Sequence, residues 1–299
     1  MALRPDRSFD GHGRIFLDPE FDLESAVDLD SPSARSLDEP REEKVMPAQN
    51  RDVLPHTPGA SLYWRIRHVL ARVAFLRSSY YLLRSIRDAM RDSSERGRAE
   101  LNEEFASRED PWDYKTAYQM DRIRTEIEML DAARGTERFK NALEVGCAEG
   151  LFTEKLAPLC ERLLAVDISP VALARARKSI HEFAWVDFAL WDLRTDPVLE
   201  SRDLIVVVHA LEYVRNPLLI WRARTKFVNS LRPGGYLLIG TMKVAQIYED
   251  AWWARFLLRS GTHINNFFAK HPALRVIRTA DLYLGKDYQA VDVLLQKKT

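Results

Sequence analysis

One short segment limits the possible folds more than any other feature of the chain. The apolar run Ala142–Val145 leads into a loop with small residues at positions 146, 148 and 150, and a helix-like stretch, Leu151–Leu159, follows at once. Glycine allows a backbone to approach a ligand closely because it has no Cβ, and the first turn of a helix offers free N–H groups. The segment therefore predicts a strand–loop–helix unit of an α/β sheet, with a ligand at the loop. A tight turn without a ligand is the alternative.

The remaining chain from Glu109 onward repeats this alternation of short apolar runs and amphipathic stretches. The first five runs are separated by helix-like segments, as in a parallel sheet with crossover helices. The last two lie close together around Gly285-Lys286-Asp287, which predicts an antiparallel hairpin. We therefore expect a Rossmann-like α/β sheet of seven strands, mostly parallel, at these runs: Ala142–Val145, Leu163–Val166, Ala184–Ala189, Leu204–Val208, Tyr236–Ile239, Val276–Tyr283 and Ala290–Leu295.

The glycine spacing separates two classes of cofactor. A dinucleotide loop has the pattern G-x-G-x-x-G, whereas this loop reads Gly146-x-Ala148-x-Gly150, the shorter spacing typical of S-adenosylmethionine loops. The next apolar run ends in Asp167, where a carboxylate can accept hydrogen bonds from both ribose hydroxyls. Ser169-Pro170 then begins a helix, with Ser169 as its N-cap. We expect S-adenosylmethionine at this site; for Asp167, a role as a mere turn acid is the alternative.

Two further candidates follow later strands. Asp192 and Leu193 come after the third run, beside the expected position of the adenine, where an acid can accept from the exocyclic amine. His209 ends the fourth run, and ligands of open α/β sheets bind outside the carboxyl ends of the strands. A histidine titrates near neutrality, so His209 is the candidate general base. A positioning role for His209 is the equal alternative. The turn Leu231–Gly235 is expected to be structural, between a helix and the fifth strand.

Three regions divide the chain. Residues 1–57 contain many Asp, Glu, Ser and Pro, without sustained periodicity, which predicts a disordered acidic tail. Residues 58–105 predict a basic amphipathic helix, since apolar residues recur at three- and four-residue steps and seven arginines lie between Ser61 and Arg91. This helix is expected to pack on the main domain or on its own copy; contact of residues 61–91 with a membrane surface is the alternative. Residues 106–299 form the predicted catalytic domain.

Composition excludes several classes. The formal net charge is zero, which gives no sign of nucleic-acid binding. Two cysteines, Cys147 and Cys160, are too few for a disulfide scaffold, and no Cys/His cluster suggests a metal site. The apolar runs are short and no signal peptide is evident. We therefore expect a cytoplasmic location, with the oligomeric state left open.

The motifs together resemble a known family. The run Asn141–Pro158, Asp110-Pro-Trp112, Leu211-x-Tyr213 and the pair Trp252-Trp253 with Gly261 are similar to the nodulation protein S group of S-adenosylmethionine-dependent methyltransferases. The resemblance runs from about Asp110 to Lys297 and leaves the first 105 residues outside. It implies a class I methyltransferase and, in the enzyme resembled, methyl transfer to an amine of a deacetylated chitooligosaccharide.

The resemblance also implies roles for residues of this chain. Trp112 and Arg122 match positions that close over the cofactor, and Glu144 belongs to the cofactor loop. His209 departs from the pattern, because the family has Glu there; this change leaves the fold unaffected but puts the amine acceptor in doubt. The complete set of expected cofactor contacts is Trp112, Arg122, Glu144, Gly146, Cys147, Ala148, Gly150, Asp167, Ile168, Asp192, Leu193 and His209.

The expected function is methyl transfer from S-adenosylmethionine to a nitrogen or oxygen nucleophile of a small or saccharide acceptor. A binding or scaffold module without turnover is one alternative, and a nicotinamide-dependent oxidoreductase is another. The segment Val244–Pro272 is the candidate acceptor wall because aromatic faces suit sugar rings, although these aromatics would equally suit a core. Its candidate residues are Tyr248, Trp252, Trp253, His263, Phe267 and Phe268.

Overall fold

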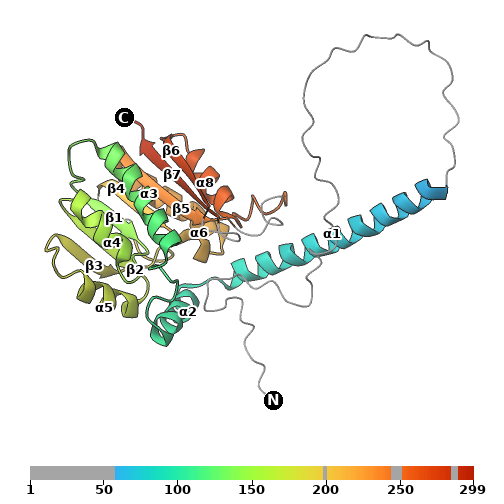
Figure 1. Cartoon of the computed structure of the whole chain (residues 1–299), viewed down its shortest axis with the longest axis horizontal. Helices are drawn as coiled ribbons and strands as arrows, with labels where there is room; N and C mark the ends of the chain where they lie inside the picture. The colour runs from blue at the N-terminus through green and yellow to red at the C-terminus, as the bar shows by residue number, and fades with distance from the viewer. Residues whose placement is uncertain (1–57, 198–200, 244–250, 284–288) are drawn as a thin grey trace, which may run out of the picture. The chain divides into compact units, whose positions relative to one another are not determined.

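The computed structural model describes residues 58–197, 201–243, 251–283 and 289–299, with only the helical backbone for 58–72. The described residues do not include the predicted acidic tail at 1–57, Tyr248 or the hairpin turn at 285–287. The chain divides into two compact units, Met1–Phe75 and Leu76–Thr299, and the second contains the sheet. Figure 1 shows the order of the elements along the chain.

A seven-stranded sheet with the order β3-β2-β1-β4-β5-β7-β6 forms the centre of the second unit. The first five strands of the chain pair in parallel, and β7 is antiparallel to both β5 and β6. The predicted fold, with its C-terminal antiparallel pair, is confirmed. The strands are β1 (Ala142–Val145), β2 (Leu163–Asp167), β3 (Val186–Leu190), β4 (Arg202–Val208), β5 (Leu231–Met242), β6 (Leu274–Tyr283) and β7 (Gln289–Lys297).

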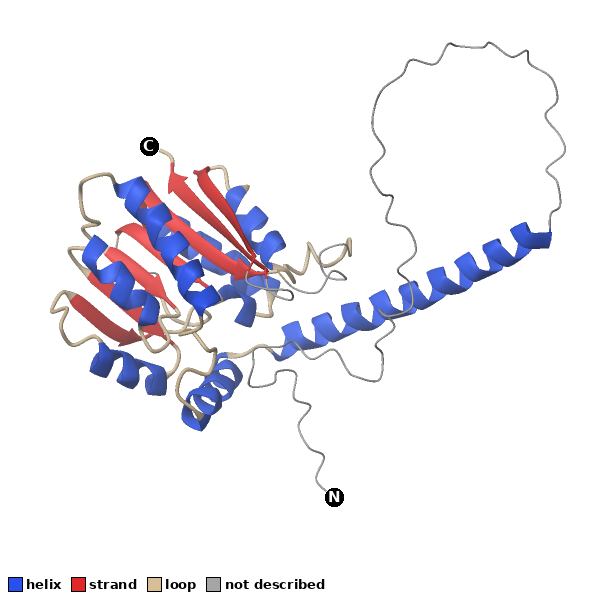
Figure 2. Cartoon of the chain, in the orientation of Figure 1, coloured by secondary structure: helices blue, strands red, loops and turns tan. Residues whose placement is uncertain are grey.

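Helices cover both faces of the sheet (Figure 2), which explains why the central strands are continuous apolar runs. One core contains Ile205 and Val207 of β4 with residues of α6 and α8, and the other contains Leu204 and Val206 with residues of α3 and α4. The helices and 3₁₀ helices of this part are α3 (Ala117–Arg134), α4 (Leu151–Leu156), η3 (Ala157–Leu159), α5 (Pro170–Ser179), η4 (Leu211–Tyr213), α6 (Pro217–Ser230) and α8 (Gly261–Ala269).

The turn predicted at Leu231–Gly235 differs in detail from expectation. Helix α6 ends at Ser230 and β5 begins at Leu231, so the glycine turn belongs to the strand. Leu231 pairs with Arg202 and Tyr236 pairs with Leu204, which leaves four residues of β5 opposite a single residue of β4. Gly234 has a φ of 78°, a left-handed value that favours glycine. The glycines therefore form an irregularity inside a strand pair rather than a separate connection.

The helical segment predicted over residues 58–105 consists of two helices, α1 (Pro58–Arg91) and α2 (Ser94–Ser107). Ser93 has extended backbone angles, and its side chain accepts a hydrogen bond from the Arg96 N–H, so it is the N-cap of α2. Apolar periodicity did not reveal this break because neither glycine nor proline marks it. No described helix is both long and apolar enough to cross a membrane.

Candidate active site

The loop between β1 and α4 requires glycine for reasons of conformation and packing. Gly146 and Gly150 have φ values of 81° and 90°, which few other residues adopt. A Cβ on Gly146 would lie 2.6 Å from the Ala210 Cβ, and a Cβ on Gly150 would clash with the Ile180 side chain. The glycines thus make room for protein side chains, where the sequence suggested room for a ligand. Ala148 also has a positive φ, of 48°.

Asp167, at the end of β2, forms a hydrogen bond to this loop. Its carboxylate accepts the N–H of Ala148 at 2.9 Å and the N–H of Ser169 at 2.8 Å. Burial raises the pKa of Asp167, and these backbone donors oppose the rise. A carboxylate has about four acceptor positions, so two remain for further hydroxyl donors. The neighbouring Ile168 is half-buried.

Asp192, Leu193 and Cys147 are buried near the same end of the sheet. One oxygen of Asp192 accepts the N–H of Arg194 at 2.8 Å, and the other has no hydrogen-bond partner within the described residues. Leu193 belongs to a core cluster. Burial raises the pKa of the Cys147 thiol well above its usual range, so the thiol stays protonated and unreactive. Of these three residues, Asp192 has a carboxylate oxygen that could accept a hydrogen bond from a ligand.

Glu144, in the middle of β1, is a buried carboxyl group. It is 1% exposed, and one of its oxygens has no hydrogen-bond partner within the described residues. Burial raises its pKa to about 8. Glu144 is therefore protonated over much of the neutral range and can act as a hydrogen-bond donor.

Helix α2 covers this end of the sheet, which the sequence did not predict. Asp92, just before α2, accepts the Arg194 Nε–H at 3.0 Å and the backbone N–H groups of Arg215 and Asn216 at 2.8 and 3.0 Å. Within α2, Asn102 accepts the Ser169 hydroxyl at 2.6 Å. These bonds connect α2 to the segments that follow β2, β3 and η4.

The predicted closing residues Trp112 and Arg122 come from the segments that follow α2. The Trp112 indole N–H donates to the Tyr213 hydroxyl at 2.6 Å, and its ring lies 4.8 Å from that of Phe105. Arg122 is buried, and its Nη1 lies 2.9 Å from both carboxylate oxygens of Glu126. Trp112 therefore lies above η4, whereas Arg122 forms part of a buried charge cluster.

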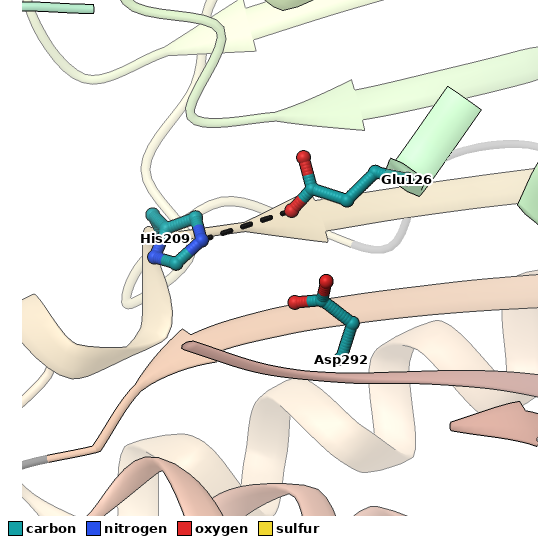
Figure 3. Close-up of side chains that lie close together, drawn as sticks. All are labelled: Glu126, His209 and Asp292. Atoms are coloured by element: carbon teal, nitrogen blue, oxygen red, sulfur yellow. Dashed lines mark ion pairs between the residues drawn. The ribbon is translucent and has the colours of Figure 1, made fainter. Parts of the chain in front are cut away.

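That cluster surrounds His209 (Figure 3). His209 follows β4 with a φ of 53°, and its backbone N–H donates to the Gly240 carbonyl. Its Nδ1 lies 3.3 Å from Glu212 and its Nε2 lies 3.7 Å from Glu126. Asp292 of β7 is 2% exposed, and neither of its oxygens has a hydrogen-bond partner within the described residues.

Gly240 explains how two buried acids fit together. It pairs with Val208 of β4 on one side and with Asp292 of β7 on the other. A Cβ on Gly240 would lie 2.8 Å from an oxygen of Asp292 and 2.8 Å from an oxygen of Glu126. Glycine therefore leaves the space into which both carboxylates point, level with the carboxyl end of β4.

The surroundings in the cluster shift the pKa values of His209 and Asp292. Burial and Arg122 lower the pKa of His209, but the carboxylates of Glu126 and Glu212 outweigh them and raise it. Burial and Glu126 raise the pKa of Asp292 well above its usual range. Three carboxyl groups thus surround one guanidinium and one imidazole, which favours a cation or a polar hydrogen-bond donor beside Asp292.

Glu126, Glu212 and Asp292 are not among the residues predicted from the sequence. A usable signal existed for two of them. Glu126 lies three residues after the buried Ile123 and four before the buried Leu130, on the apolar stripe of α3. Asp292 interrupts the apolar run Ala290–Leu295. A charged residue at a position that periodicity assigns to the core indicates a buried polar site.

A metal ion is one possible occupant of this cluster. One ligand atom each from Glu126, His209 and Asp292 lies within 4.8 Å of the others. The Arg122 guanidinium already supplies a positive charge to Glu126, and a metal cation would compete with it. An organic cation beside Asp292 and Glu212 avoids this competition.

The predicted acceptor wall is wrong in part. Phe268 belongs to the core against Phe227, and Trp253 is buried, with its indole N–H bonded to Ser78 of α1. Phe267 packs on the Arg224 guanidinium. Trp252 is exposed, His263 is half-buried, and Tyr248 lies outside the described residues.

Comparisons with known proteins identify the family to which the chain is similar. A family model described as "Nodulation protein S (NodS)" matches residues 94–256, so the family match begins at α2, in the part that the sequence resemblance left outside. Nodulation protein S of Sinorhizobium fredii is 37% identical over 142 residues, which cover 47% of this chain and 64% of that protein. The chain thus spans less than two thirds of the length of that curated relative.

A second type of relative is named as an O-methyltransferase. The ubiquinone biosynthesis O-methyltransferase of Xanthomonas campestris is 32% identical over 163 residues, 51% of this chain and 66% of that protein. Among solved structures, the N-methyltransferase NodS of Bradyrhizobium japonicum in complex with S-adenosylhomocysteine is 27% identical, with a TM-score of 0.59. That alignment covers 68% of this chain and 99% of that structure.

Proposed function

The chain belongs to the nodulation protein S family, and on that basis we propose that it is an S-adenosylmethionine-dependent methyltransferase. The similar NodS structure contains S-adenosylhomocysteine, the product that methyl transfer leaves behind, and almost all of that structure aligns with this chain. The glycine loop and Asp167 at the ends of β1 and β2 support the same cofactor. When bound, S-adenosylmethionine supplies an electrophilic methyl group on its sulfonium.

The proposed cofactor site lies along the carboxyl ends of β1, β2 and β3. Asp167 binds the ribose with its remaining acceptor positions, and the free oxygen of Asp192 accepts from the adenine amine. The loop from Gly146 to Gly150, including Cys147 and Ala148, lies against the amino-acid part of the cofactor. Around these, Ile168 and Leu193 supply apolar contact, and Trp112 closes the site from the N-terminal side, with Glu144 beneath the loop. Arg122, the other expected closing residue, instead pairs with Glu126.

We propose an amine as the acceptor group. The single observation that carries this choice is Asp292, a buried carboxyl group whose two oxygens lack partners within the described residues. The family Glu that His209 replaces is compensated by Glu212 and Asp292, so the negative charge needed to hold an ammonium is present. The acceptor class that fits is a small molecule or saccharide that carries an amine.

Asp292 and His209 have different roles in the proposed proton transfer. The acceptor nitrogen must lose a proton before its lone pair can form a bond to the methyl carbon as the carbon–sulfur bond breaks. A bound ammonium favours the ionised form of Asp292. That carboxylate then accepts the proton, since an ionised carboxyl group with a raised pKa is a stronger base. The raised pKa of His209 leaves it more protonated than an ordinary histidine, which favours a positioning role. A hydroxyl acceptor would instead need His209 in its neutral form as the base.

Calorimetric titration with S-adenosylhomocysteine tests the cofactor, with NAD as the control. Binding of S-adenosylhomocysteine alone supports the proposal, and binding of NAD alone would favour an oxidoreductase. Transfer of a labelled methyl group from S-adenosylmethionine then tests the acceptor. We expect product with a glucosamine oligomer and none with its N-acetylated form, which keeps the hydroxyl groups but lacks the amine. Cofactor binding without transfer to any amine or hydroxyl would favour a scaffold module.

A further inference from the structure

The second half of α1 exposes an unusual amount of apolar surface. Of the fourteen large apolar side chains that are exposed in the described residues, five lie between Leu76 and Met90. Leu83 is 67% exposed and Met90 is 76% exposed. A contiguous apolar surface of this kind on a soluble domain marks a binding surface.

Apolar and basic residues form two adjacent rows on this half of the helix. Leu76, Leu83 and Met90 recur every seven residues, close to two helical turns, and therefore lie in one row. Arg77, Arg84 and Arg91 recur at the same interval and form a second row, rotated by about 100° from the first. An apolar face with arginines along its edge is the arrangement of helices that lie in a membrane interface.

The opposite side of this half of the helix packs on the rest of the domain. Ser78, which accepts a hydrogen bond from the Trp253 indole N–H at 2.9 Å, is rotated by about 200° from Leu76. Ser85, rotated by about 180°, is 1% exposed. The apolar row therefore faces away from the domain.

The charge pattern distinguishes the possible partners. From Leu76 to Arg91 there are four arginines and one acid, Asp88, which pairs with Arg87. A second copy of the same helix would bring like-charged arginine rows together, which costs free energy. An anionic lipid surface complements the arginines and accepts the apolar row at the same time. No described helix can cross the bilayer, so the helix would lie along the surface.

We propose that residues 76–91 of α1 dock the protein on an anionic lipid surface. The inference does not depend on the methyl-transfer proposal, because it rests on different residues. It predicts that apolar burial and arginine charge both contribute to binding, so that removal of either weakens it.

Sedimentation of the full chain with lipid vesicles tests the proposal. We compare vesicles of phosphatidylcholine with vesicles of phosphatidylcholine and phosphatidylglycerol in equal parts, and expect binding to the anionic vesicles to fall as salt rises. The variant Leu76→Ser/Leu83→Ser/Met90→Ser should bind at least about tenfold more weakly, since each buried leucine contributes about 1.5–3 kcal/mol. The variant Arg77→Gln/Arg91→Gln should lose about thirtyfold, at about 1 kcal/mol for each arginine near the surface.

Matched controls come from exposed residues elsewhere. Leu218→Ser/Trp221→Ser on α6 removes exposed apolar side chains, and Arg124→Gln/Arg222→Gln removes exposed arginines. Circular dichroism establishes that each variant is folded. Equal binding to both vesicle types, or equal loss in variants and controls, would overturn the proposal. A dimer seen by light scattering that the triple serine variant abolishes would also overturn it, in favour of a contact between copies.

Discussion

Two acids on the same edge of the sheet have opposite surroundings. Asp167, in the proposed cofactor half formed by β1, β2 and β3, accepts backbone N–H groups with both oxygens. Asp292, in the half formed by β4, β5 and β7, has no partner for either oxygen within the described residues. Both are buried. Asp167 is therefore hydrogen-bonded without a ligand, whereas Asp292 has two unsatisfied oxygens that a second ligand would satisfy.

The difference follows from how each half is built. Asp167 and the loop that it binds lie at the ends of the adjacent strands β2 and β1, and backbone N–H groups make the contacts of Asp167. The cluster around Asp292 gathers side chains from α3, η4 and β7. Arg122 and His209 lie beside its carboxyl groups, and Gly240 leaves the space in which they fit together. The first half therefore suits a ligand common to many proteins, and the second suits an acceptor specific to this one.

The largest expected effect separates the two halves directly. Asp292→Asn keeps the shape of the side chain but removes its charge and basicity, so turnover should fall by about 10²–10⁴-fold while S-adenosylhomocysteine affinity stays nearly unchanged. Steady-state kinetics and calorimetry measure the two quantities. Asp281→Asn on the neighbouring strand removes an exposed acid and is the control. A parallel loss of affinity and turnover would mean that Asp292 belongs to the cofactor half.

The residues around Asp167 were easier to predict from the sequence than those around Asp292. The glycine loop, Asp167 and the N-cap Ser169 were predictable because each signal is local and tied to a strand end. Glu126 and Asp292 were missed because they belong to different elements and meet only in the folded sheet. Helix α2 was placed outside the resemblance, since nothing in its sequence indicates that Asp92 and Asn102 contact loops far along the chain.

A second substitution tests the cofactor half. Asp167→Asn removes the charge that we expect the ribose hydroxyls to bind, and a hydrogen bond to a charged group contributes about 1.5–3 kcal/mol. The affinity for S-adenosylhomocysteine should therefore fall by about ten- to hundredfold. Calorimetry measures the affinity, and the thermal midpoint shows whether the loop remains folded. Unchanged affinity in a folded variant would remove Asp167 from the cofactor site.

Stability against pH tests whether the acceptor half carries the charges inferred above. The folded-state pKa of His209 is raised, so its contribution to stability is fully present below the unfolded pKa of about 6.5 and is lost as pH rises through the folded pKa. The free energy of unfolding should therefore decrease across this range by an amount set by the difference between the two pKa values. Denaturant unfolding on both sides of that range measures the loss.

His209→Asn should remove this part of the pH dependence, whereas His181→Asn, at an exposed position, should leave it intact. The acids that face His209 are Glu126 and Glu212, with Asp292 close by. A steeper fall of stability with pH in His209→Asn would show that the imidazole is neutral in the folded protein. The base role that the sequence suggested would then be restored to His209.

The smallest expected effect concerns the cover that α2 forms over the cofactor half. Asn102→Ala removes the acceptor of the Ser169 hydroxyl, and Ser169 in turn donates its N–H to Asp167. A hydrogen bond contributes about 0.5–1.5 kcal/mol, so S-adenosylhomocysteine should bind a few-fold more weakly. Thr225→Ala is the matched control, because that hydroxyl is exposed and bonds only within its own helix. If α2 is a passive neighbour, the two variants will bind the ligand equally. A weaker affinity for Asn102→Ala alone would make residues that precede the sheet part of the cofactor half.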